Sequence, residues 1–182
     1  MAILKVARLG HPVLRKVAEA VSPEELRSPA MQRFIDDMVE TMREYNGAGL
    51  AATQVHVPKQ LCVIEVHRNP RYPEAPEIPL TVLIDPRWSP LTDEMEEDWE
   101  GCLSIPDLRG KVPRYTTVRL EALDRNGEPI NLTAQHFFAR VLQHETDHLN
   151  GIVYLDRMKD FSTLTHLTEW SKYWLGRQEQ ND

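Results

Sequence analysis

The stretch "QHETDHLNG", residues 143–151, holds two histidines and a glutamate at a spacing that suits a metal site. On an α-helix, His144 and His148 lie four residues apart on one face, so both imidazoles can bind one divalent ion. Glu145 then lies beside that ion, where its carboxylate can accept a proton from water. A catalytic site of this type takes three protein ligands, so the sequence predicts a metal site whose third ligand must be found elsewhere.

Three residues are candidates for the third ligand. Tyr154 stands where one class of HExxH proteases has its third histidine, so that pattern fails at this position. Glu169, in "LTEW", lies in the region from which a thermolysin-like protease takes a glutamate ligand. Cys102, in "WEGCLSIP", offers a thiolate, which is a soft ligand suited to a borderline metal such as zinc. The residues alone leave Glu169 and Cys102 open.

The size and charge of the chain limit the classes of protein to which it can belong. Its 182 residues, 41% of them apolar, suit one globular domain, and we expect residues 1–182 to form that single domain. A net charge of −7 and the lack of a Lys/Arg-rich run argue against direct binding to nucleic acid. No apolar window approaches the length of a membrane span. Two cysteines, Cys62 and Cys102, exclude a disulfide scaffold, so we expect a cytoplasmic protein.

Hydrophobic periodicity predicts the helices. Ser22 is a candidate N-cap for a helix that ends at Gly47, with apolar residues at three- and four-residue steps between them. A second helix is predicted from Thr133, its candidate N-cap, to a stop at Gly151. We expect a last, shorter helix in the tail, about residues 159–182.

Short apolar runs predict the strands. Residues 60–66, 80–85 and 117–123 are rich in β-branched and aliphatic side chains, and the turn sequence "DRNGE" after the last run indicates a hairpin. The proline-rich segment 67–80 is predicted to be a long irregular loop. Because strands and helices are mixed without βαβ alternation, the sequence favours the α+β class.

Three motifs, in this order, resemble the signatures of the peptide deformylases: "GAGLAATQ" (47–54), "EGCLS" (100–104) and "QHETDHL" (143–149). The resemblance extends from about residue 3 to about residue 157. It implies an α+β fold in which mixed and antiparallel sheets pack around a central helix that carries the HExxH motif. It also implies a hydrolase that removes the formyl group from the N-terminal formyl-methionine of nascent polypeptides and releases formate.

The resemblance also implies roles for individual residues. Cys102 completes the metal site with the two histidines of the HExxH motif. Glu145 is the general base toward water and then the acid that protonates the leaving amine. The side-chain amide of Gln54 and the backbone N–H of Leu103 donate hydrogen bonds to the oxyanion that develops on the formyl group.

The metal and the partners follow from the ligand types and from the resemblance. A set of one cysteine and two histidines favours zinc by ligand type. The resemblance instead implies Fe(II) in the cell, with zinc, nickel or cobalt as its replacements in purified protein. The implied partners are N-formyl-methionyl nascent peptides, met transiently near the ribosome in the bacterial cytoplasm. Neither a membrane nor a nucleic acid is an expected partner.

Small and apolar residues are predicted to hold the substrate. Gly47 and Gly49 lack side chains, so an extended peptide can approach and pair with the chain there. Helical spacing places Phe137 and Val141 on the face of His144, where they form an apolar wall for the methionine side chain. The residues predicted to bind the substrate are Gly47, Gly49, Leu50, Gly101, Phe137 and Val141.

Arg140 and Asp147, on the helix predicted from Thr133 to Gly151, have none of the roles given above. Arg140 stands where an apolar residue is expected, and its side chain either extends outward to solvent or narrows the mouth of the substrate pocket. Asp147 is neither ligand nor base by position. We expect it to pair with a cation such as Arg114 and so to fix the helix against the hairpin.

Overall fold

The computed structural model describes residues 2–67, 71–72 and 75–175. The helices are α1 Pro23–Arg27, α2 Pro29–Glu44, α3 His136–Leu149 and α4 Leu167–Tyr173. Short 3₁₀ helices lie at Pro12–Arg15, Ala52–Val55, Tyr154–Arg157 and Phe161–Thr163. The strands are β1 Gly49–Ala51, β2 Leu61–Val66, β3 Ile78–Pro90, β4 Met95–Cys102, β5 Ile105–Tyr115, β6 Thr117–Leu123, β7 Pro129–Gln135 and β8 Thr165–His166. The predicted α+β class is confirmed.

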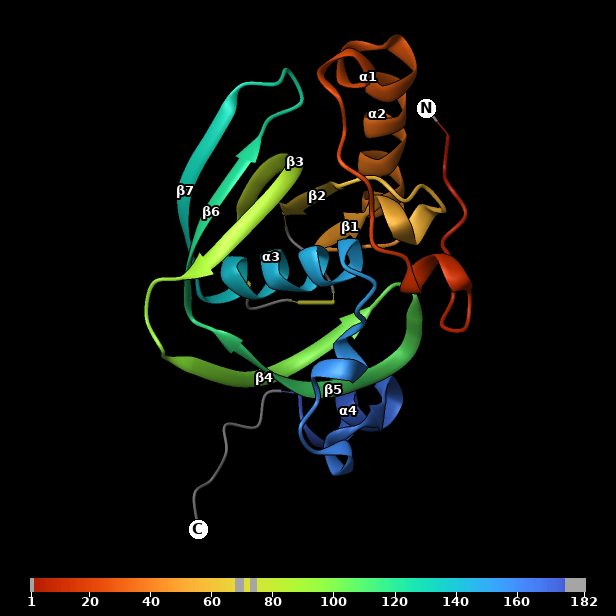
Figure 1. The fold of residues 1–182 in the computed structure, drawn as a ribbon. Coiled ribbons are helices and arrows are strands. Elements are labelled where there is room, and N and C mark those ends of the chain that lie inside the picture. Colours follow the sequence, from red (N-terminus) through yellow and green to blue (C-terminus); the bar gives the residue numbers. More distant parts are fainter. Residues whose placement is uncertain (1, 68–70, 73–74, 176–182) are drawn as a thin grey trace.

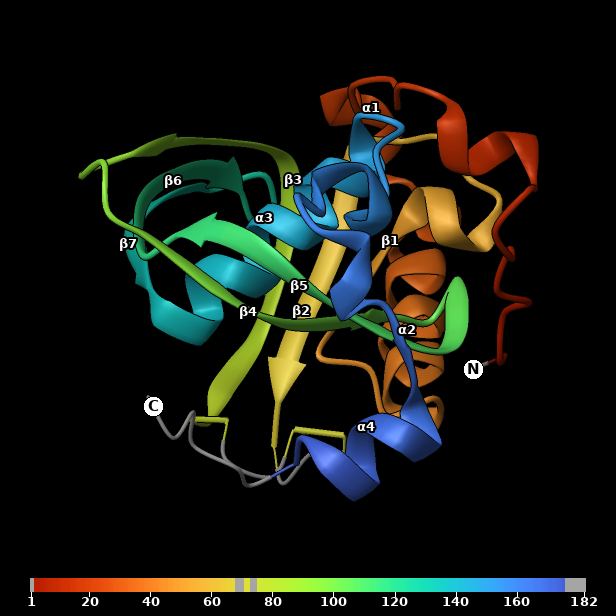
Figure 2. The same ribbon diagram turned by 90° about the horizontal axis from the view of Figure 1, so that it is seen from below.

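The strands form two antiparallel sheets. The larger sheet has the order β1-β2-β3-β6-β7, and the smaller has the order β4-β5-β8. Every pair of neighbouring strands in these two sheets is antiparallel. Helix α3 lies between the larger sheet and the β4–β5 hairpin (Figure 1), and both strands of the hairpin pass across the helix when the molecule is viewed from below (Figure 2). The sheets therefore pack around a central helix, as the resemblance implied.

Helix α3 is buried on all sides over most of its length. Every residue from Ala139 to Leu149 is buried, although this stretch includes several polar and charged side chains. A buried polar group is costly unless it forms hydrogen bonds. Gln143 meets this condition by bonding both the backbone N–H and the carbonyl of Tyr115 on β5, at 3.1 and 2.9 Å. These polar contacts fix the helix against the hairpin.

Helix α2 covers the other face of the larger sheet. Its apolar residues recur at three- and four-residue steps, and Ile35, Met38 and Met42 are fully buried. They pack with Leu50 of β1 and Leu61 of β2 in one hydrophobic cluster. This layer holds β1 in place beside α3, and β1 carries the glycine motif.

The first predicted helix is divided in two. Ser22 caps α1 as predicted, by accepting a hydrogen bond from the backbone N–H of Glu25. The chain then leaves the helical conformation at Ser28, whose ψ of 141° is extended. The cause is Pro29, because a proline disfavours the helical conformation of the residue before it. The prediction of one continuous helix up to Gly47 was therefore wrong.

The start of the second predicted helix was also wrong. Thr133 is not its N-cap but a residue of β7, where it pairs with Arg119 of β6. Along β7, Ile130, Leu132 and Ala134 turn toward the core, and the residues between them are exposed. This period of two is that of a strand with one buried face. Helix α3 begins only at His136.

The predicted tail helix and the predicted loop are shorter than expected. Within the tail, 159–182, α4 covers Leu167–Tyr173, and β8 precedes it and pairs with β5. Residues 176–182 lie outside the described part of the chain. Strand β3 begins at Ile78, inside the predicted loop 67–80, of which 68–70 and 73–74 also lie outside the described part.

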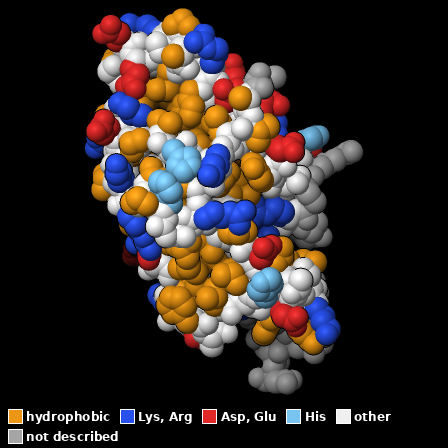
Figure 3. All heavy atoms as spheres, turned by 90° about the vertical axis from the view of Figure 1, so that its right-hand side faces the viewer, with side chains coloured by type: hydrophobic (Ala, Val, Ile, Leu, Met, Phe, Trp, Pro, Cys, Tyr) orange, Lys and Arg blue, Asp and Glu red, His pale blue; other side chains and the backbone are white. Residues whose placement is uncertain are grey.

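The surface is mixed in character. On the face drawn in Figure 3, apolar side chains lie among cationic side chains and histidines, and acidic side chains gather mainly toward the edges. Among the described residues, no helix has the length and apolar character needed to cross a membrane.

The central position of α3 makes its apolar side chains important for stability. Leu142 is fully buried between the sheets, so Leu142→Ala should lower the free energy of unfolding by about 2–5 kcal/mol through lost burial and a residual cavity. Leu80→Ala is the matched control, because Leu80 is 40% exposed on β3 and its loss should cost at most about 0.5 kcal/mol. Urea unfolding measures both values. Equal losses of unfolding free energy in the two variants would contradict the burial of Leu142 between the sheets.

Candidate metal centre

Three potential metal ligands converge at the centre of the molecule. Cys102 ends β4, and His144 and His148 lie one turn apart on α3. Their ligand atoms all lie within 4.8 Å of one another, and all three residues are buried. The Sγ atom of Cys102 is 3.1 Å from Nε2 of His148. The three side chains can thus face a single ion, whereas Glu169, the rival third ligand, is exposed on α4.

The ring of His144 is oriented by a carboxylate. Its Nδ1 atom is 2.9 Å from Oε2 of Glu100 on β4. Burial would raise the pKa of Glu100, but the Arg114 guanidinium and the His144 ring hold that pKa well below its usual range. An ionised carboxylate at Nδ1 fixes the tautomer of the imidazole and leaves Nε2 available as a ligand.

Further ion pairs extend from Glu100 toward the surface. Arg114 on β5 donates to both Glu100 oxygens, from Nε at 2.8 Å and Nη2 at 3.0 Å. Its Nη1 donates to Oδ2 of Asp147 on α3 at 2.5 Å, so the predicted pairing of Asp147 with Arg114 is confirmed. Arg157 completes the series by donating from Nη2 to Oδ1 of Asp147 at 2.7 Å. These bonds connect α3 to both strands of the hairpin.

The environment of Cys102 favours its thiolate. Burial would raise the pKa of the thiol, but the imidazoles of His148 and His144 hold that pKa well below its ordinary value. The side-chain amide of Gln54 and the backbone N–H of Ser104 also donate toward Sγ, each at 3.4 Å. The thiolate is the form that binds metals. One thiolate and two buried imidazoles therefore fit a divalent transition-metal ion.

Glu145 lies beside these ligands with its carboxylate poised for proton transfer. Burial raises its pKa to about 7, near which a carboxyl group can both accept and donate protons. Its Oε2 atom is buried and has no hydrogen-bond partner among the described residues. A Cβ atom at Gly49 would lie only 2.6 Å from Oε1 of Glu145, so β1 and the carboxylate fit together because residue 49 is glycine.

The two predicted oxyanion donors lie at the same cavity. Gln54 is 1% exposed, and its Oε1 accepts the backbone N–H of Ala51 at 2.9 Å. This bond turns the amide nitrogen toward Ser104 Oγ, at 3.1 Å, and toward the thiol of Cys102. Leu103 follows Cys102 in the turn between β4 and β5 and also lines the cavity.

A cavity of about 40 Å³ opens beside the ligands. It is lined by five of the six residues predicted to bind substrate, namely Gly47, Gly49, Gly101, Phe137 and Val141. Leu50 is different, because it is fully buried in the cluster between α2 and the larger sheet and does not line the cavity. Its side chain points to the opposite face of β1, as the alternation along a strand requires.

Arg140 also lines this cavity, but its charged group points into the protein. The residue is only 5% exposed, so the expected alternative in which it extends outward was wrong. Its guanidinium donates to the carbonyls of Val112 and Glu96, each at 2.7 Å, and to Oε1 of Glu100 at 3.1 Å. The charge is thus neutralised inside the protein, and the aliphatic part of the side chain remains beside the cavity.

Two residues of the hydrogen-bonded series beside the ligands, Glu100 and Arg157, were missed in the sequence. Glu100 could have been found, because it lies two residues before Cys102 on the same strand and therefore faces the same side. Arg157 gives no comparable signal, because it lies in a short 3₁₀ helix after α3 and its partner is ten residues away.

Comparisons with known proteins show the family of this chain. A family model described as "Polypeptide deformylase" matches residues 3–163. The chain is 49% identical over 158 residues to Peptide deformylase 1 of Nitrosomonas europaea, which covers 87% of this chain and 89% of that protein. It is 47% identical over 160 residues to Peptide deformylase 2 of Ralstonia nicotianae, with 88% and 89% covered.

Solved structures give the same result. The class I type b peptide deformylase of Acinetobacter baumannii bound to Met-Ala-Ser has a TM-score of 0.83 at 41% identity, covering 86% of this chain and 99% of that one. A peptide deformylase of Synechococcus elongatus in complex with actinonin has a TM-score of 0.78 at 36% identity, covering 94% and 86%. The sequence, the fold and these likenesses agree that the chain belongs to the polypeptide deformylase family and is an enzyme.

Proposed function

We propose that this site removes the formyl group from the N-terminal formyl-methionine of nascent polypeptides and releases formate. The observation that carries the proposal is the convergence of Cys102, His144 and His148 beside the buried carboxylate of Glu145. Deformylation is the activity of the family to which the chain belongs. We also infer that residues 1–182 form one catalytic domain, since α3 packs against strands of both sheets.

The proposed ligands are the Cys102 thiolate and one nitrogen from each of His144 and His148. When bound, a divalent ion would supply a Lewis acid that makes water nucleophilic near neutral pH and polarises the formyl oxygen. We infer Fe(II) as the ion in the cell, with zinc, nickel or cobalt as replacements in purified protein. A thiolate with two imidazoles is a donor set that binds each of these metals.

Glu145 is the proposed proton carrier. Its carboxylate takes a proton from water as the water attacks the formyl carbon, and it then delivers that proton to the amine that leaves. The pKa of about 7 supports both steps, because neither protonation state is costly near neutral pH. The unpartnered Oε2 supports the same role, since this oxygen is free to bond water or substrate.

Gln54 and Leu103 are the proposed donors to the oxyanion. Attack on the formyl carbon places negative charge on its oxygen, and donors that are already oriented stabilise that charge most effectively. The amide of Gln54 is held by Ala51 and Ser104 before substrate binds, which supports this role. The backbone N–H of Leu103 is the second proposed donor.

The peptide is proposed to lie along β1, with its methionine side chain in the cavity. Strand β1 is at the edge of the larger sheet, so an extended peptide can pair with it at Gly49 and with the segment before it at Gly47. Phe137 and Val141 are proposed to contact the methionine side chain, with Gly101 leaving room for the peptide. The Met-Ala-Ser peptide bound to the Acinetobacter baumannii enzyme supports a ligand that begins with methionine.

The cellular setting is inferred from the substrate. Formyl-methionine is present on nascent chains, so we infer that the enzyme meets its substrates transiently near the ribosome in the bacterial cytoplasm. The relatives reported above are bacterial proteins, which supports this setting.

Formate release is the direct test of the proposed function. Protein loaded with Fe(II) under anaerobic conditions should release formate from formyl-Met-Ala-Ser. It should release no product from acetyl-Met-Ala-Ser or from an unblocked internal peptide, because neither carries a formyl group. Cleavage of the internal peptide instead would indicate an endopeptidase, and no formate from any peptide with metal bound would contradict the proposal.

The same assay tests the proton carrier. Glu145→Gln keeps the shape of the side chain but cannot accept the proton, so the rate of formate release should fall roughly 10²- to 10⁴-fold. Glu169→Gln is the matched control, because it makes the same chemical change at an exposed position of α4. Full activity in Glu145→Gln would assign proton transfer to another group.

Metal content distinguishes the two candidates for the third ligand. Cys102→Ala removes a thiolate from the group of three, so the purified protein should lose its stoichiometric metal. Glu169→Ala should retain about one ion per chain, because Glu169 is exposed on α4. Elemental analysis after gel filtration measures both. The reverse pattern would identify a thermolysin-like site.

The apolar wall of the cavity can be tested through KM. Phe137→Ala removes roughly 50 Å² of apolar contact, and at about 25 cal/mol/Å² this should raise KM for formyl-methionyl peptides roughly tenfold. Metal content should remain unchanged, since Phe137 bonds none of the ligands. Phe161→Ala is the matched control, because Phe161 is 61% exposed. Unchanged kinetics in Phe137→Ala would refute the pocket assignment.

A further inference from the structure

A continuous series of hydrogen bonds runs from a metal ligand to the protein surface. It begins at Nδ1 of His144, continues through Glu100, Arg114 and Asp147, and ends at Arg157. The charges of the last four side chains alternate in sign, so each link is a charge-assisted bond. The links come from four segments of the chain, namely α3, β4, β5 and the 3₁₀ helix Tyr154–Arg157.

Arg157 is the outermost link and holds both oxygens of Asp147. It donates from Nη2 to Oδ1 at 2.7 Å and from Nε to Oδ2 at 3.1 Å. Arg114 bonds only Oδ2, so Oδ1 has Arg157 as its one hydrogen-bond partner among the described residues. The side chain of Asp147 is 6% exposed, and a buried carboxylate oxygen without a partner is costly. Loss of Arg157 should therefore cause the Asp147 carboxylate to turn.

Arg157 lies where such a change can occur. Its side chain is 45% exposed, and it lines a polar cavity of about 800 Å³ together with Asp147, Thr146 and Asn150. Thr146 and Asn150 stand two and six residues after His144, so this cavity lies on the side of α3 away from the metal ligands. Without Arg157, the Asp147 carboxylate would turn toward this cavity, where water gives Oδ1 a new partner.

A turn of the Asp147 carboxylate would displace the Arg114 guanidinium, because Nη1 of Arg114 donates to Asp147. The other donors of Arg114, Nε and Nη2, bond the Glu100 carboxylate, which would then move as well. Because Glu100 fixes the ring of His144, the orientation of that ring depends on this series. The dependence is partial, since Arg140 also bonds Glu100 Oε1 at 3.1 Å and would keep one oxygen in place.

From these contacts we propose that Arg157 is a positioning residue for the metal centre. It holds Asp147, and through Arg114 and Glu100 it keeps the His144 ring in the orientation that binds the ion. Partners that bond a metal ligand directly contribute roughly 10- to 100-fold to metal affinity or activity. Arg157 is three links further out, so the expected effect of its loss is smaller, about three- to tenfold. The proposal rests on the metal ligands of the proposed function and does not depend on the substrate.

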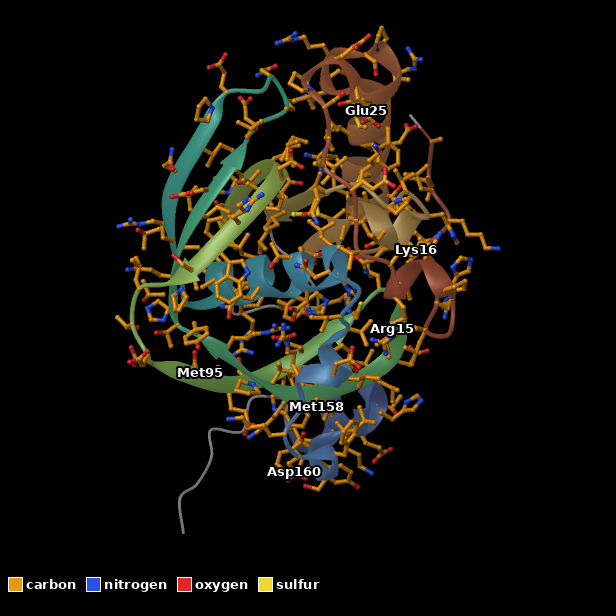
Figure 4. The ribbon with its side chains drawn as sticks, viewed as in Figure 1. Arg15, Lys16, Glu25, Met95, Met158 and Asp160 are labelled. Atoms are coloured by element: carbon orange, nitrogen blue, oxygen red, sulfur yellow. The ribbon has the colours of Figure 1, made fainter. Side chains whose placement is uncertain are left out.

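The test uses the full chain loaded with Co(II), in the wild type, Arg157→Ala and Arg157→Lys. The control is Arg15→Ala, because Arg15 forms an exposed ion pair with Asp156, the neighbour of Arg157, and has no link to Asp147. Figure 4 labels Arg15 close to the segment that follows α3. The measurements are the visible absorption spectrum of bound Co(II), the rate at which a chelator removes the ion, and the thermal unfolding midpoint.

In Arg157→Ala, the ligand-field bands of Co(II) should shift and the ion should leave about three to ten times faster than in the wild type. Arg157→Lys should restore part of the difference, since an ammonium group keeps the charge but not the two-point contact. Arg15→Ala should match the wild type in the Co(II) spectrum and in the release rate, and the unfolding midpoint checks that each variant is folded.

Two outcomes would overturn the proposal. One is an unchanged spectrum and dissociation rate in Arg157→Ala. The other is an equal change in Arg157→Ala and Arg15→Ala, which would trace the effect to the loss of any surface ion pair. If the wild type itself failed to bind Co(II), the metal ligands of the proposed function would be wrong, and Arg157 would have no metal centre to position.

Discussion

The structure depends on one buried carboxylate, that of Glu100. It lies on β4, and its partners are Arg114 on β5 and Arg140 and His144 on α3. An ionised carboxylate inside a protein costs several kcal/mol unless it is paired and hydrogen-bonded. The three elements can therefore pack together only in an arrangement that satisfies Glu100. Since His144 is one of the partners, the same requirement that selects the packing also orients a metal ligand.

The burial of α3 explains how a helix with so many polar residues can form the centre of the molecule. Its apolar side chains, such as Leu142 and Leu149, fill the space toward the larger sheet. Gln143 is satisfied by backbone groups of β5, and Asp147 by its ion pair with Arg114. Oε2 of Glu145, beside the metal ligands, is a buried atom of this helix that has no partner among the described residues. Burial of the helix also has a chemical result. Exclusion from water raises the pKa of Glu145, and the same exclusion from water stabilises the packed Leu142 side chain. Packing and reactivity have one cause here.

The sequence predicted the local features of this site and missed the nonlocal ones. Helical spacing alone placed His144 and His148 together, but it left Cys102 and Glu169 as equal candidates, because nothing local says which segment folds back onto α3. The break at Pro29 could have been predicted, since the constraint acts on the neighbouring residue. The partner of Asp147 at Arg157 could not, because the pairing depends on how the chain turns after the helix.

The contact between Gly49 and Glu145 bears on how mutational data for this fold should be interpreted. The missing Cβ of Gly49 leaves the space that the Glu145 carboxylate occupies, with only 2.6 Å between Oε1 and the position where that carbon would be. Every other amino acid carries at least this one carbon. In Gly49→Ala the Glu145 side chain would have to shift, so a loss of activity in that variant would report on Glu145 and not on a reactive group of residue 49. Its contribution is the absence of a side chain, which leaves to Glu145 the space that its carboxylate occupies.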